Sequence, residues 1–412
     1  MFKNILKDSF IVATILFLLF VIFEIFCFYK ITKSQNHTKV KKEYIPLLKY
    51  SKIGEENLAN HFQNINLLGF KNNGIREYHP SLIYLYKPNL SSETFYTNSF
   101  GLLDDEPNLS KKQILILGSS VVGSGLRQNL KENIDQYLEK QIDETVGENI
   151  YEVINAGIGG YTSNQEFNLM HLLSDKIFFD KVIYMSGAND IDARYRVKDF
   201  DDLRSYDIIH SRVVKSQIED NLNLRKNPII SIYTYLRHYF LPSLNSYKYL
   251  GDLVHAKRVS TINQITKVDL DKKDYTFINE IVQNYLSNIK KMIFLTKNKN
   301  IQLYVGLQPT IFTKNFKTKN EEKNFNILIN KFGFKYVLYY EQAYPMMKKG
   351  LELLKKDYPE NLTLLDTDII FNNTKIDIFR DNVHFLEYSN ELVAKKIFNY
   401  LNFNTKKLND WS

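Results

Sequence analysis

The sequence is poor in cysteine, glycine and proline. Cys27 is the single cysteine among 412 residues, so no disulfide can form within the chain and no cluster of cysteines can bind a metal ion. With 16 glycines and 9 prolines, the chain is short of the residues that tight turns need, which argues against a β-sandwich of many strands.

Nucleic-acid-binding motifs are also missing. The net charge of +8 would suit an anionic partner. The lysines are spread over the whole chain, however, and no basic stripe with interleaved aromatic residues is present. We therefore predict no nucleic-acid partner.

One long apolar run stands near the N-terminus. Residues 10–29 read FIVATILFLLFVIFEIFCFY, and Glu24 is the only charged residue in the run. A helix that crosses a bilayer needs about 20 apolar residues. No small-residue cleavage site follows the run, and Phe26 before Cys27 is too large for a lipoprotein signal. We therefore predict an uncleaved membrane anchor behind a short flank at 1–9, with Glu24 either at the interface or bonded to a partner helix.

Two further segments separate the anchor from the main domain. Residues 30–60 are rich in lysine and lack hydrophobic periodicity, so we predict a polar stalk there. Residues 61–110 contain short apolar runs and turn signals such as Asn73-Gly74 and the stretch TNSFG at 97–101. We predict that they form an N-terminal cap on a main domain at 111–405.

Strand and helix patterns alternate along the main domain. Short, apolar, β-branched-rich runs predict strands at Gln113–Leu117, Glu152–Asn155, Lys181–Met185, Ile301–Gly306 and Leu362–Leu365. Helical patterns cover Asn129–Gln141, Asn164–Leu173, Phe277–Thr296, Tyr339–Lys356 and Tyr388–Leu401. The alternation predicts an α/β fold, a three-layer α/β/α sandwich with a parallel, doubly wound (flavodoxin-like) sheet of five strands. Residues 191–275 break the rhythm, and we interpret them as a helical insert, either a lid or a packing extension.

Polar residues and glycines follow the predicted strands at the edge where ligands bind in such folds. Ser119 and Ser120 follow the first strand, and a helix N-terminus there favours the negative charge that a nucleophile creates. Gly160 follows the second strand and lets a backbone N–H approach a ligand. Asn189 follows the third and offers an N–H donor for a developing oxyanion. Each block alone also fits a plain turn or a helix cap.

A DxxH pattern occurs three times, at Asp207/His210, Asp252/His255 and Asp381/His384. An Asp at this spacing can hold the imidazole in the tautomer that accepts a serine proton. Only the last pair lies after the last predicted strand and before the last predicted helix, at the same sheet edge as Ser120. We therefore select Asp381 and His384 as the acid and base, and interpret the other two pairs as structural.

Taken together, these blocks resemble the SGNH (GDSL-type) hydrolase superfamily, in particular its membrane-anchored bacterial members. The family is named after a Ser, a Gly, an Asn and a His, which Ser120, Gly160, Asn189 and His384 match. The later blocks carry the resemblance best: NAGIGGYTSNQ at 155–165, GAND at 187–190 and DNVHFLEYSNELVAKKI at 381–397.

The resemblance implies a serine hydrolase that needs neither metal nor cofactor. Its triad would be Ser120, Asp381 and His384, and its oxyanion hole would combine the N–H groups of Ser120 and Gly160 with the Asn189 side chain. The first block departs from the family pattern in two ways. Ser119 stands where the family has an Asp, and the spacing between Ser120 and Gly123 is one residue shorter than is common in the family. Ser119 is therefore the alternative nucleophile.

The predicted function is hydrolysis or transfer of acyl groups on cell-envelope glycans or lipids by a membrane-anchored esterase. One alternative is a polysaccharide O-acetyltransferase of the same fold, supplied by an integral-membrane acyl donor protein. Another is a catalytically inactive glycan-binding or assembly protein. The family places the main domain in the periplasm or otherwise outside the cytoplasm, whereas the lysines that follow the anchor favour the cytoplasm. We adopt the extracytoplasmic placement as the prediction.

Overall fold

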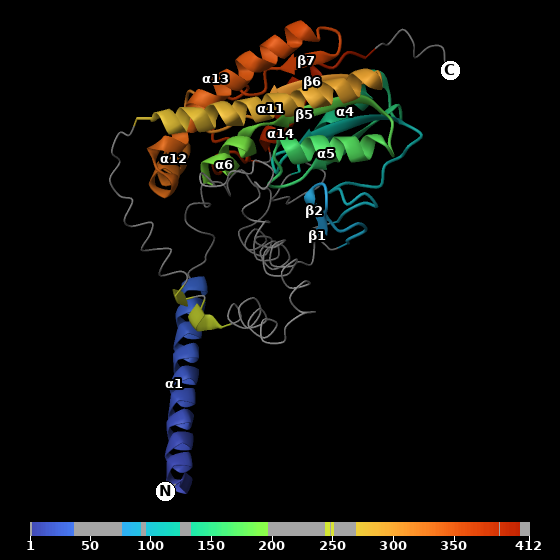
Figure 1. Ribbon diagram of the computed structural model, residues 1–412. Coiled ribbons are helices and arrows are strands. Elements are labelled where there is room, and N and C mark those ends of the chain that lie inside the picture. The colour runs from blue at the N-terminus through green and yellow to red at the C-terminus, as the bar shows by residue number, and fades with distance from the viewer. Residues whose placement is uncertain are drawn as a thin grey trace. The chain divides into compact units, whose positions relative to one another are not determined.

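A computed structural model describes residues 2–36, 76–91, 96–123, 133–196, 244–247, 249–250, 269–386 and 388–403. The chain divides into two compact units, which are coloured along the sequence in Figure 1. One unit contains Met1–Glu43 with Val213–Gln264, and the other contains Tyr44–Arg212 with Ile265–Ser412.

A five-stranded parallel sheet forms the centre of the second unit. Its strands are β3 (Lys112–Gly118), β4 (Tyr151–Gly157), β5 (Phe179–Ser186), β6 (Gln302–Leu307) and β7 (Leu362–Leu365). They pair in the order β4-β3-β5-β6-β7, with every neighbouring pair parallel. Nearly every residue of β3 and β5 is buried, because helices cover both faces of the sheet. The predicted doubly wound sheet of five strands is confirmed.

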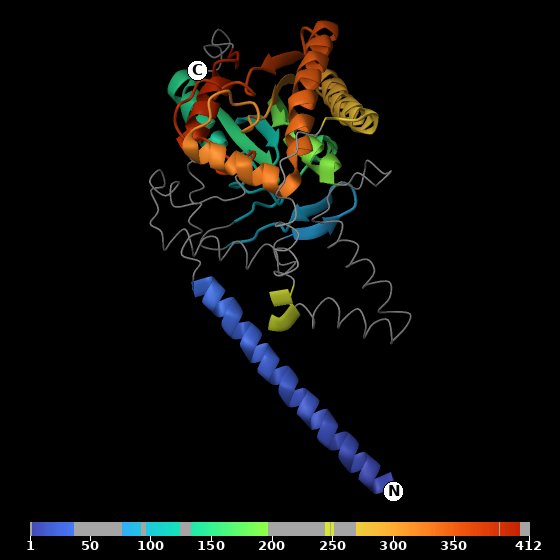
Figure 2. The ribbon, with the colours of Figure 1, turned by 90° about the vertical axis from the view of Figure 1, so that its left-hand side faces the viewer.

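Helices form the two outer layers. They are α4 (Ile134–Val146), α5 (Ser163–Ser174), α6 (Ala188–Arg196), α11 (Lys272–Asn298), α12 (Lys319–Phe332), α13 (Phe334–Asp357) and α14 (Tyr388–Phe398). α4 packs against α14, while α11 packs against both α5 and α13. Figure 2 shows α14 and α4 on one side of the sheet and α11 with α13 on the other.

Several elements differ from the sequence prediction, and α11 and α13 each begin five residues before the predicted helix start. The helix predicted at Asn129–Gln141 begins as α4 at Ile134, and residues 124–132 lie outside the described part of the chain. The sequence analysis did not predict α12, whose buried residues are Glu321, Leu328 and Ile329. α6 occupies 188–196, so the first residues of the predicted insert continue a helix that starts at the end of β5.

The predicted N-terminal cap contains an antiparallel hairpin. Its strands are β1 (Arg76–His79) and β2 (Ile83–Tyr86), with Arg76 paired opposite Tyr86. Leu82 in the connecting turn is fully buried. Side chains of α5 hold this turn: Gln165 Nε2 donates to Leu82 O at 3.0 Å, and Asn168 Nδ2 donates to Ser81 O at 3.0 Å. The predicted turn at Asn73-Gly74 lies outside the described residues.

The first unit is built on α1 (Phe2–Asn36), which extends beyond the predicted anchor at both ends. The predicted flank is therefore helical from Phe2, and the first residues of the predicted stalk continue the helix. Among the described residues, no helix combines the length and the apolar character that crossing a membrane requires. The structure thus does not support the membrane span predicted at 10–29.

Glu24, the one charged residue of the apolar run, has its polar partners within the same chain. Its carboxylate accepts hydrogen bonds from the backbone N–H of Asn245 at 2.8 Å and of Ser246 at 3.0 Å, and from the Ser246 hydroxyl. Phe26 packs edge-on against Tyr249, with ring centroids 6.3 Å apart. These contacts satisfy Glu24 without the partner helix that the sequence left open, and they attach part of the predicted insert to α1.

A buried ion pair organises the segment between β7 and α14. Lys314 and Glu321 have no solvent exposure, and Lys314 Nζ donates to Glu321 Oε2 at 2.5 Å and to Ile376 O at 2.9 Å. The other oxygen, Glu321 Oε1, accepts the backbone N–H groups of Ile378 at 2.8 Å and Phe379 at 3.1 Å. One carboxylate therefore binds the start of α12, a buried lysine and the following loop together.

Replacing Lys314 by Met should destabilise the protein strongly, because the Glu321 charge would stay buried without its partner. Removal of one member of a buried ion pair costs about 3–5 kcal/mol. Urea unfolding measures this difference. Lys140→Met is the matched control, because Lys140 and its partner Glu144 are both exposed, and its unfolding midpoint should be nearly unchanged. Equal effects of the two variants would contradict the role given to Lys314.

Candidate active site

The turn after β3 carries Ser120 at the carboxyl edge of the sheet. It runs close to the end of β4, and two glycines permit this approach. A methyl group on Gly123 would lie 2.2 Å from Gly157 O, and one on Gly157 would lie 2.1 Å from Gly123 N. Any larger residue at either position would push the two turns apart, so Gly123 and Gly157 set the spacing between the first two sequence blocks.

The structure brings Ser120, His384 and Asp381 together in one hydrogen-bonded chain. His384 Nε2 lies 2.7 Å from Ser120 Oγ, and His384 Nδ1 lies 2.7 Å from Asp381 Oδ2. The other carboxylate oxygen, Asp381 Oδ1, accepts the backbone N–H groups of Val383 at 2.9 Å and His384 at 2.8 Å. The DxxH segment therefore holds its own acid in place, since the Asp side chain closes onto the backbone of the residues that follow it.

The Asp381 carboxyl is stabilised in its charged form. Burial by itself would raise its pKa, but the charge and hydrogen bonds of His384, with the charge of Arg380, hold the pKa of Asp381 well below its ordinary value. An ionised Asp381 accepts the Nδ1–H of His384. The lone pair of Nε2 then faces Ser120, and the serine hydroxyl donates to it.

Ser119, the alternative nucleophile, has a different neighbourhood. Its side chain is buried, and its hydroxyl donates to Gln308 Oε1 at 3.3 Å. Gln308 follows β6 and is fully buried as well. The structure thus places Ser120, not Ser119, against His384. The DxxH pairs at 207/210 and 252/255 lie outside the described residues.

The predicted oxyanion-hole residues Ser120, Gly160 and Asn189 follow β3, β4 and β5, which are neighbours in the sheet. In the part of the chain that the structure describes, the backbone N–H groups of Ser120 and Gly160 have no hydrogen-bond acceptor. Gly160 has a φ of +90°, which favours glycine. Asn189 Nδ2 donates one N–H to Tyr161 O at 2.9 Å, and an amide nitrogen carries a second N–H. The bond to Tyr161 O fixes Asn189 relative to the turn that contains Gly160.

A buried polar network behind Asn189 joins the second and third sequence blocks. Asp190 accepts both the backbone N–H of Ser163 at 3.1 Å and the Ser163 hydroxyl at 2.5 Å, so it caps the start of α5. Ser163 Oγ also accepts from Asn288 Nδ2 on α11 at 2.9 Å. The sequence allowed for a capping role of the Asn-Asp pair, and the structure assigns that role to Asp190.

Two carboxyl groups of this network have raised pKa values. Burial raises the pKa of Asp190 to about 6, although its bonds from Ser163 oppose the rise. Burial and the nearby Asp190 charge raise the pKa of Glu166 well above its ordinary value. Glu166 Oε2 accepts from Tyr184 at 2.8 Å and Oε1 accepts from Ser186 at 2.8 Å. Two neighbouring acids in a dry site cannot both ionise at low cost, so the network is sensitive to pH.

Three tyrosines of α13 hold the loops of the site, and sequence analysis did not assign them. Tyr340 OH donates to Ala188 O at 3.1 Å, and Tyr344 OH donates to Gln308 O at 2.9 Å. Asn382 Nδ2, in the loop of the acid and base, donates to Tyr336 OH at 3.0 Å. The spacing of four residues between the tyrosines puts them on one helix face, which is the signal that could have identified them.

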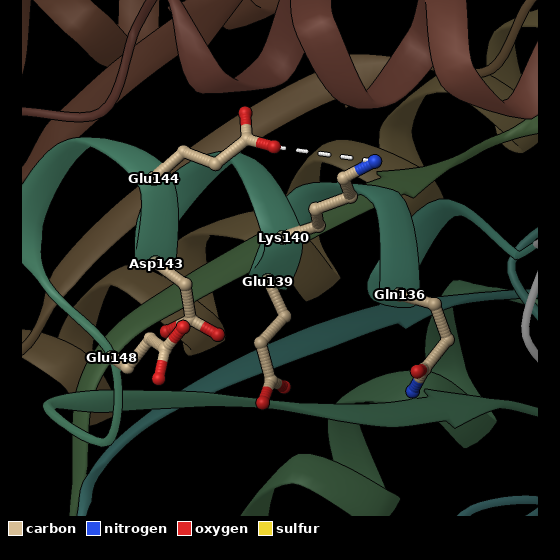
Figure 3. A pocket seen from close by; sticks show the side chains of 6 residues that line it. All are labelled: Gln136, Glu139, Lys140, Asp143, Glu144 and Glu148. Carbon is tan, nitrogen blue, oxygen red and sulfur yellow. Dashed lines mark ion pairs between the residues drawn. The ribbon is translucent and has the colours of Figure 1, made fainter.

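An acidic cavity of about 390 Å³ lies elsewhere, along α4. Figure 3 shows Glu139, Asp143 and Glu148 close together. It also shows the ion pair between Lys140 and Glu144, in which Lys140 Nζ lies 3.9 Å from Glu144 Oε1. None of the predicted site residues lines this cavity. Among the described residues, no group of three or more His, Cys, Asp or Glu side chains is arranged to hold a metal ion.

Comparison with known proteins gives only distant likenesses. No protein-family model matches the chain, and no curated protein matches it in sequence. Axe2, an acetylxylan esterase from Geobacillus stearothermophilus, is a solved structure with 14% identity and a TM-score of 0.34, covering 71% of this chain and 95% of that one. A member of the lipolytic protein G-D-S-L family from Veillonella parvula DSM 2008 has 12% identity and a TM-score of 0.36, with coverages of 70% and 97%. At such low scores the likeness carries no weight for the function.

The stability of the protein should depend on pH through Asp190. Asp190 has a pKa of about 6 in the folded chain and an ordinary value of 3.8. The folded state therefore binds more protons between these values, and stability falls as pH rises from about 4 to about 7. A shift of this size corresponds to about 3 kcal/mol. The unfolding free energy of the wild type should fall by about that amount relative to Asp190→Asn, as measured by urea unfolding across this range.

Asp190→Ala separates titration from capping. It should show the same pH slope as Asp190→Asn, because neither side chain ionises. It should also be less stable at every pH by about 1 kcal/mol, because the cap of α5 is lost. A difference between the wild type and Asp190→Asn that stays constant with pH would contradict the assigned titration.

Proposed function

We propose that this chain is a serine esterase of the SGNH type that removes acyl groups from cell-envelope glycans or lipids. The observation that carries the proposal is the unbroken hydrogen-bonded chain from Ser120 Oγ through both ring nitrogens of His384 to Asp381. Nucleophile, base and orienting acid within hydrogen-bond reach form the arrangement that activates a serine.

Ester cleavage on this geometry proceeds through an acyl-enzyme. Ser120 Oγ attacks the ester carbonyl while His384 Nε2 accepts the serine proton. The alcohol then leaves with that proton, and the acyl group stays on Ser120. A water molecule next gives its proton to His384 and attacks the acyl-enzyme, which releases the carboxylic acid and restores the serine. Asp381 stays ionised throughout and stabilises the charged imidazole.

The oxyanion of each tetrahedral intermediate faces three donors. These are the backbone N–H groups of Ser120 and Gly160 and the second N–H of Asn189. Removal of one donor of this kind typically raises the activation free energy by about 2.7–4 kcal/mol. Asn189 is held by Tyr161 O before the substrate arrives, so little reorganisation is needed when charge develops.

An O-acetyltransferase would use the same acyl-enzyme, with a sugar hydroxyl in place of water and a membrane protein as acyl donor. A glycan-binding protein without activity would not need the bond from Ser120 to His384. We prefer the esterase because it requires only the groups that the site contains.

We also propose that α1 attaches the protein to a membrane, with the second unit outside the cytoplasm. Large apolar side chains along α1 are exposed, including Leu16, Leu19, Phe20, Ile22 and Phe23. Exposed apolar surface of this extent is costly in water and favourable against lipid.

A fluorophosphonate probe should label the wild-type protein at Ser120. Ser120→Ala removes the attacking hydroxyl, so its labelling rate should fall at least about 1000-fold. Ser119→Ala is the matched control, because the Ser119 hydroxyl bonds to Gln308 whereas Ser120 bonds to His384, and its rate should stay within about tenfold. Peptide mapping that finds the probe on Ser119 would refute the assignment of the nucleophile.

Membrane attachment is tested by fractionation of the full chain. We expect the wild type to stay with the membrane after a carbonate wash, because α1 presents apolar side chains. The combined change Leu16→Glu, Leu19→Glu and Phe23→Glu should release it, whereas alanine at the same three positions should not. Wild-type protein in the soluble fraction would argue against attachment.

A further inference from the structure

Tyr336 on α13 places a hydroxyl group in a fixed position inside the protein. Its side chain has no solvent exposure. Its ring packs against the rings of Tyr195, Phe312 and Phe332, at centroid distances of 5.0, 5.7 and 4.8 Å. Because these rings come from three other positions in the fold, the packing alone restricts where the hydroxyl oxygen can lie.

The hydrogen bonds of this hydroxyl have defined directions. Tyr336 OH donates to Asp192 Oδ1 at 2.6 Å, and Asn382 Nδ2 donates to the Tyr336 oxygen at 3.0 Å. A carboxylate oxygen accepts, so the single proton of Tyr336 lies towards Asp192 and a lone pair faces Asn382. Burial, with the nearby Tyr340 and Asp192, raises the pKa of Tyr336 well above its ordinary value, and the hydroxyl therefore keeps its proton at neutral pH.

The two partners of Tyr336 belong to different parts of the site. Asn382 directly follows the acid of the triad, and the base follows two residues later. Asp192 lies on α6, three residues after Asn189 and therefore on the adjacent turn of the helix. Tyr336 thus connects the loop of the acid and base to the helix that carries the oxyanion-hole amide.

Asn382 is held at two points that mutation can separate. Its carbonyl oxygen accepts the backbone N–H of Ile311, in the loop after β6, at 2.9 Å. Its side chain donates to Tyr336. The first bond survives a change of side chain at position 382, whereas the second needs both the amide and the hydroxyl.

We propose that Tyr336 is a positioning residue that fixes the loop of Asp381 and His384 relative to the helix of Asn189. This inference rests on the proposed esterase function. Attack on an ester requires the base to lie at the serine while the oxyanion donors lie at the carbonyl oxygen. The base and the donors must therefore keep one mutual position, and Tyr336 bonds to both of the segments that carry them.

Tyr336→Phe tests the proposal in the full-length protein, because it removes the hydroxyl and keeps the ring. We expect kcat on 4-nitrophenyl acetate to fall about 10–100-fold, since a displacement of about 1 Å can cost this much. KM should change less than about threefold, because no group assigned to substrate binding is removed. The rate at which a fluorophosphonate probe labels Ser120 should fall by a factor similar to that of kcat/KM.

Tyr339→Phe is the matched control for the loss of a buried hydroxyl. Tyr339 lies on the same helix, has no solvent exposure, and donates to a carboxylate oxygen of α11, Asp274 Oδ1, at 2.8 Å. Each variant leaves a carboxylate without one of its bonds, so both should lower the urea midpoint of unfolding. Only Tyr336→Phe should lower kcat.

Asn382→Ala removes the same bond from the side of the loop and leaves the bond between its carbonyl and Ile311. Its kcat should fall by a factor similar to that of Tyr336→Phe. The double variant with Tyr336→Phe should be no slower than the slower single variant, because both changes remove one shared bond. Asn382→Ala also tests the bond where Tyr336→Phe does not fold.

The outcomes distinguish this inference from the proposed function. A kcat within about twofold of the wild type in either single variant would overturn the positioning role. So would losses that multiply in the double variant, or equal losses of kcat in Tyr336→Phe and Tyr339→Phe. In these cases the wild type is still labelled and active, and the esterase stands. Absence of both labelling and turnover in the wild type would overturn the proposed function, and this inference with it.

Discussion

Glu321 is a carboxylate without solvent exposure, and the chain itself occupies both of its oxygens. One oxygen binds Lys314 and the backbone N–H of Thr318, and the other binds two consecutive N–H groups of the loop after β7. That loop carries the acid and the base two to six residues further on. Hydrogen bonds to a charged group contribute about 1.5–3 kcal/mol each, so the bonds from Ile378 and Phe379 to Glu321 fix where the loop begins.

The remaining site loops are fixed by other means but meet at the same edge. Two opposed glycines set the separation of the turns after β3 and β4. Asp190 joins the third block to the start of α5, and the tyrosines of α13 bind the loops after β5, β6 and β7. Each loop is therefore held by groups on an element other than its own. The nucleophile and its base, 264 residues apart in sequence, reach hydrogen-bond distance through these tertiary contacts.

Much of the architecture could be predicted because parallel strands buried on both faces leave a clear apolar signal. β3, β5 and β6 are such runs, and their order along the chain indicated which edge would carry polar residues. Asp381 and His384 could be selected for the same reason, since their place relative to the strands separated them from two identical patterns. The choice between Ser119 and Ser120 needed side-chain positions, because adjacent residues in a turn point in different directions.

The sequence did not reveal α12, the role of Glu321 or the place of the β1–β2 hairpin. α12 buries little apolar surface, and Glu321 looks like an ordinary surface residue in a charged segment until the loop bonds to it. The β1–β2 hairpin precedes the sheet in sequence, and nothing in the sequence indicates that Tyr84 reaches Gly159 O. At residues 10–29 the sequence carried a signal that the structure does not support. The apolar composition predicted a membrane span, and no described helix has the length and apolar character that a span requires.

Many of the bonds that hold the site end on main-chain carbonyl oxygens. Tyr340, Tyr344 and Tyr84 bind the carbonyls of Ala188, Gln308 and Gly159, and Gln165 binds that of Leu82. Every amino acid supplies such a carbonyl. These bonds therefore do not depend on which side chains the bonded loop residues carry. Loop residues can be replaced during evolution, which changes the substrate, while the nucleophile and its base keep their positions.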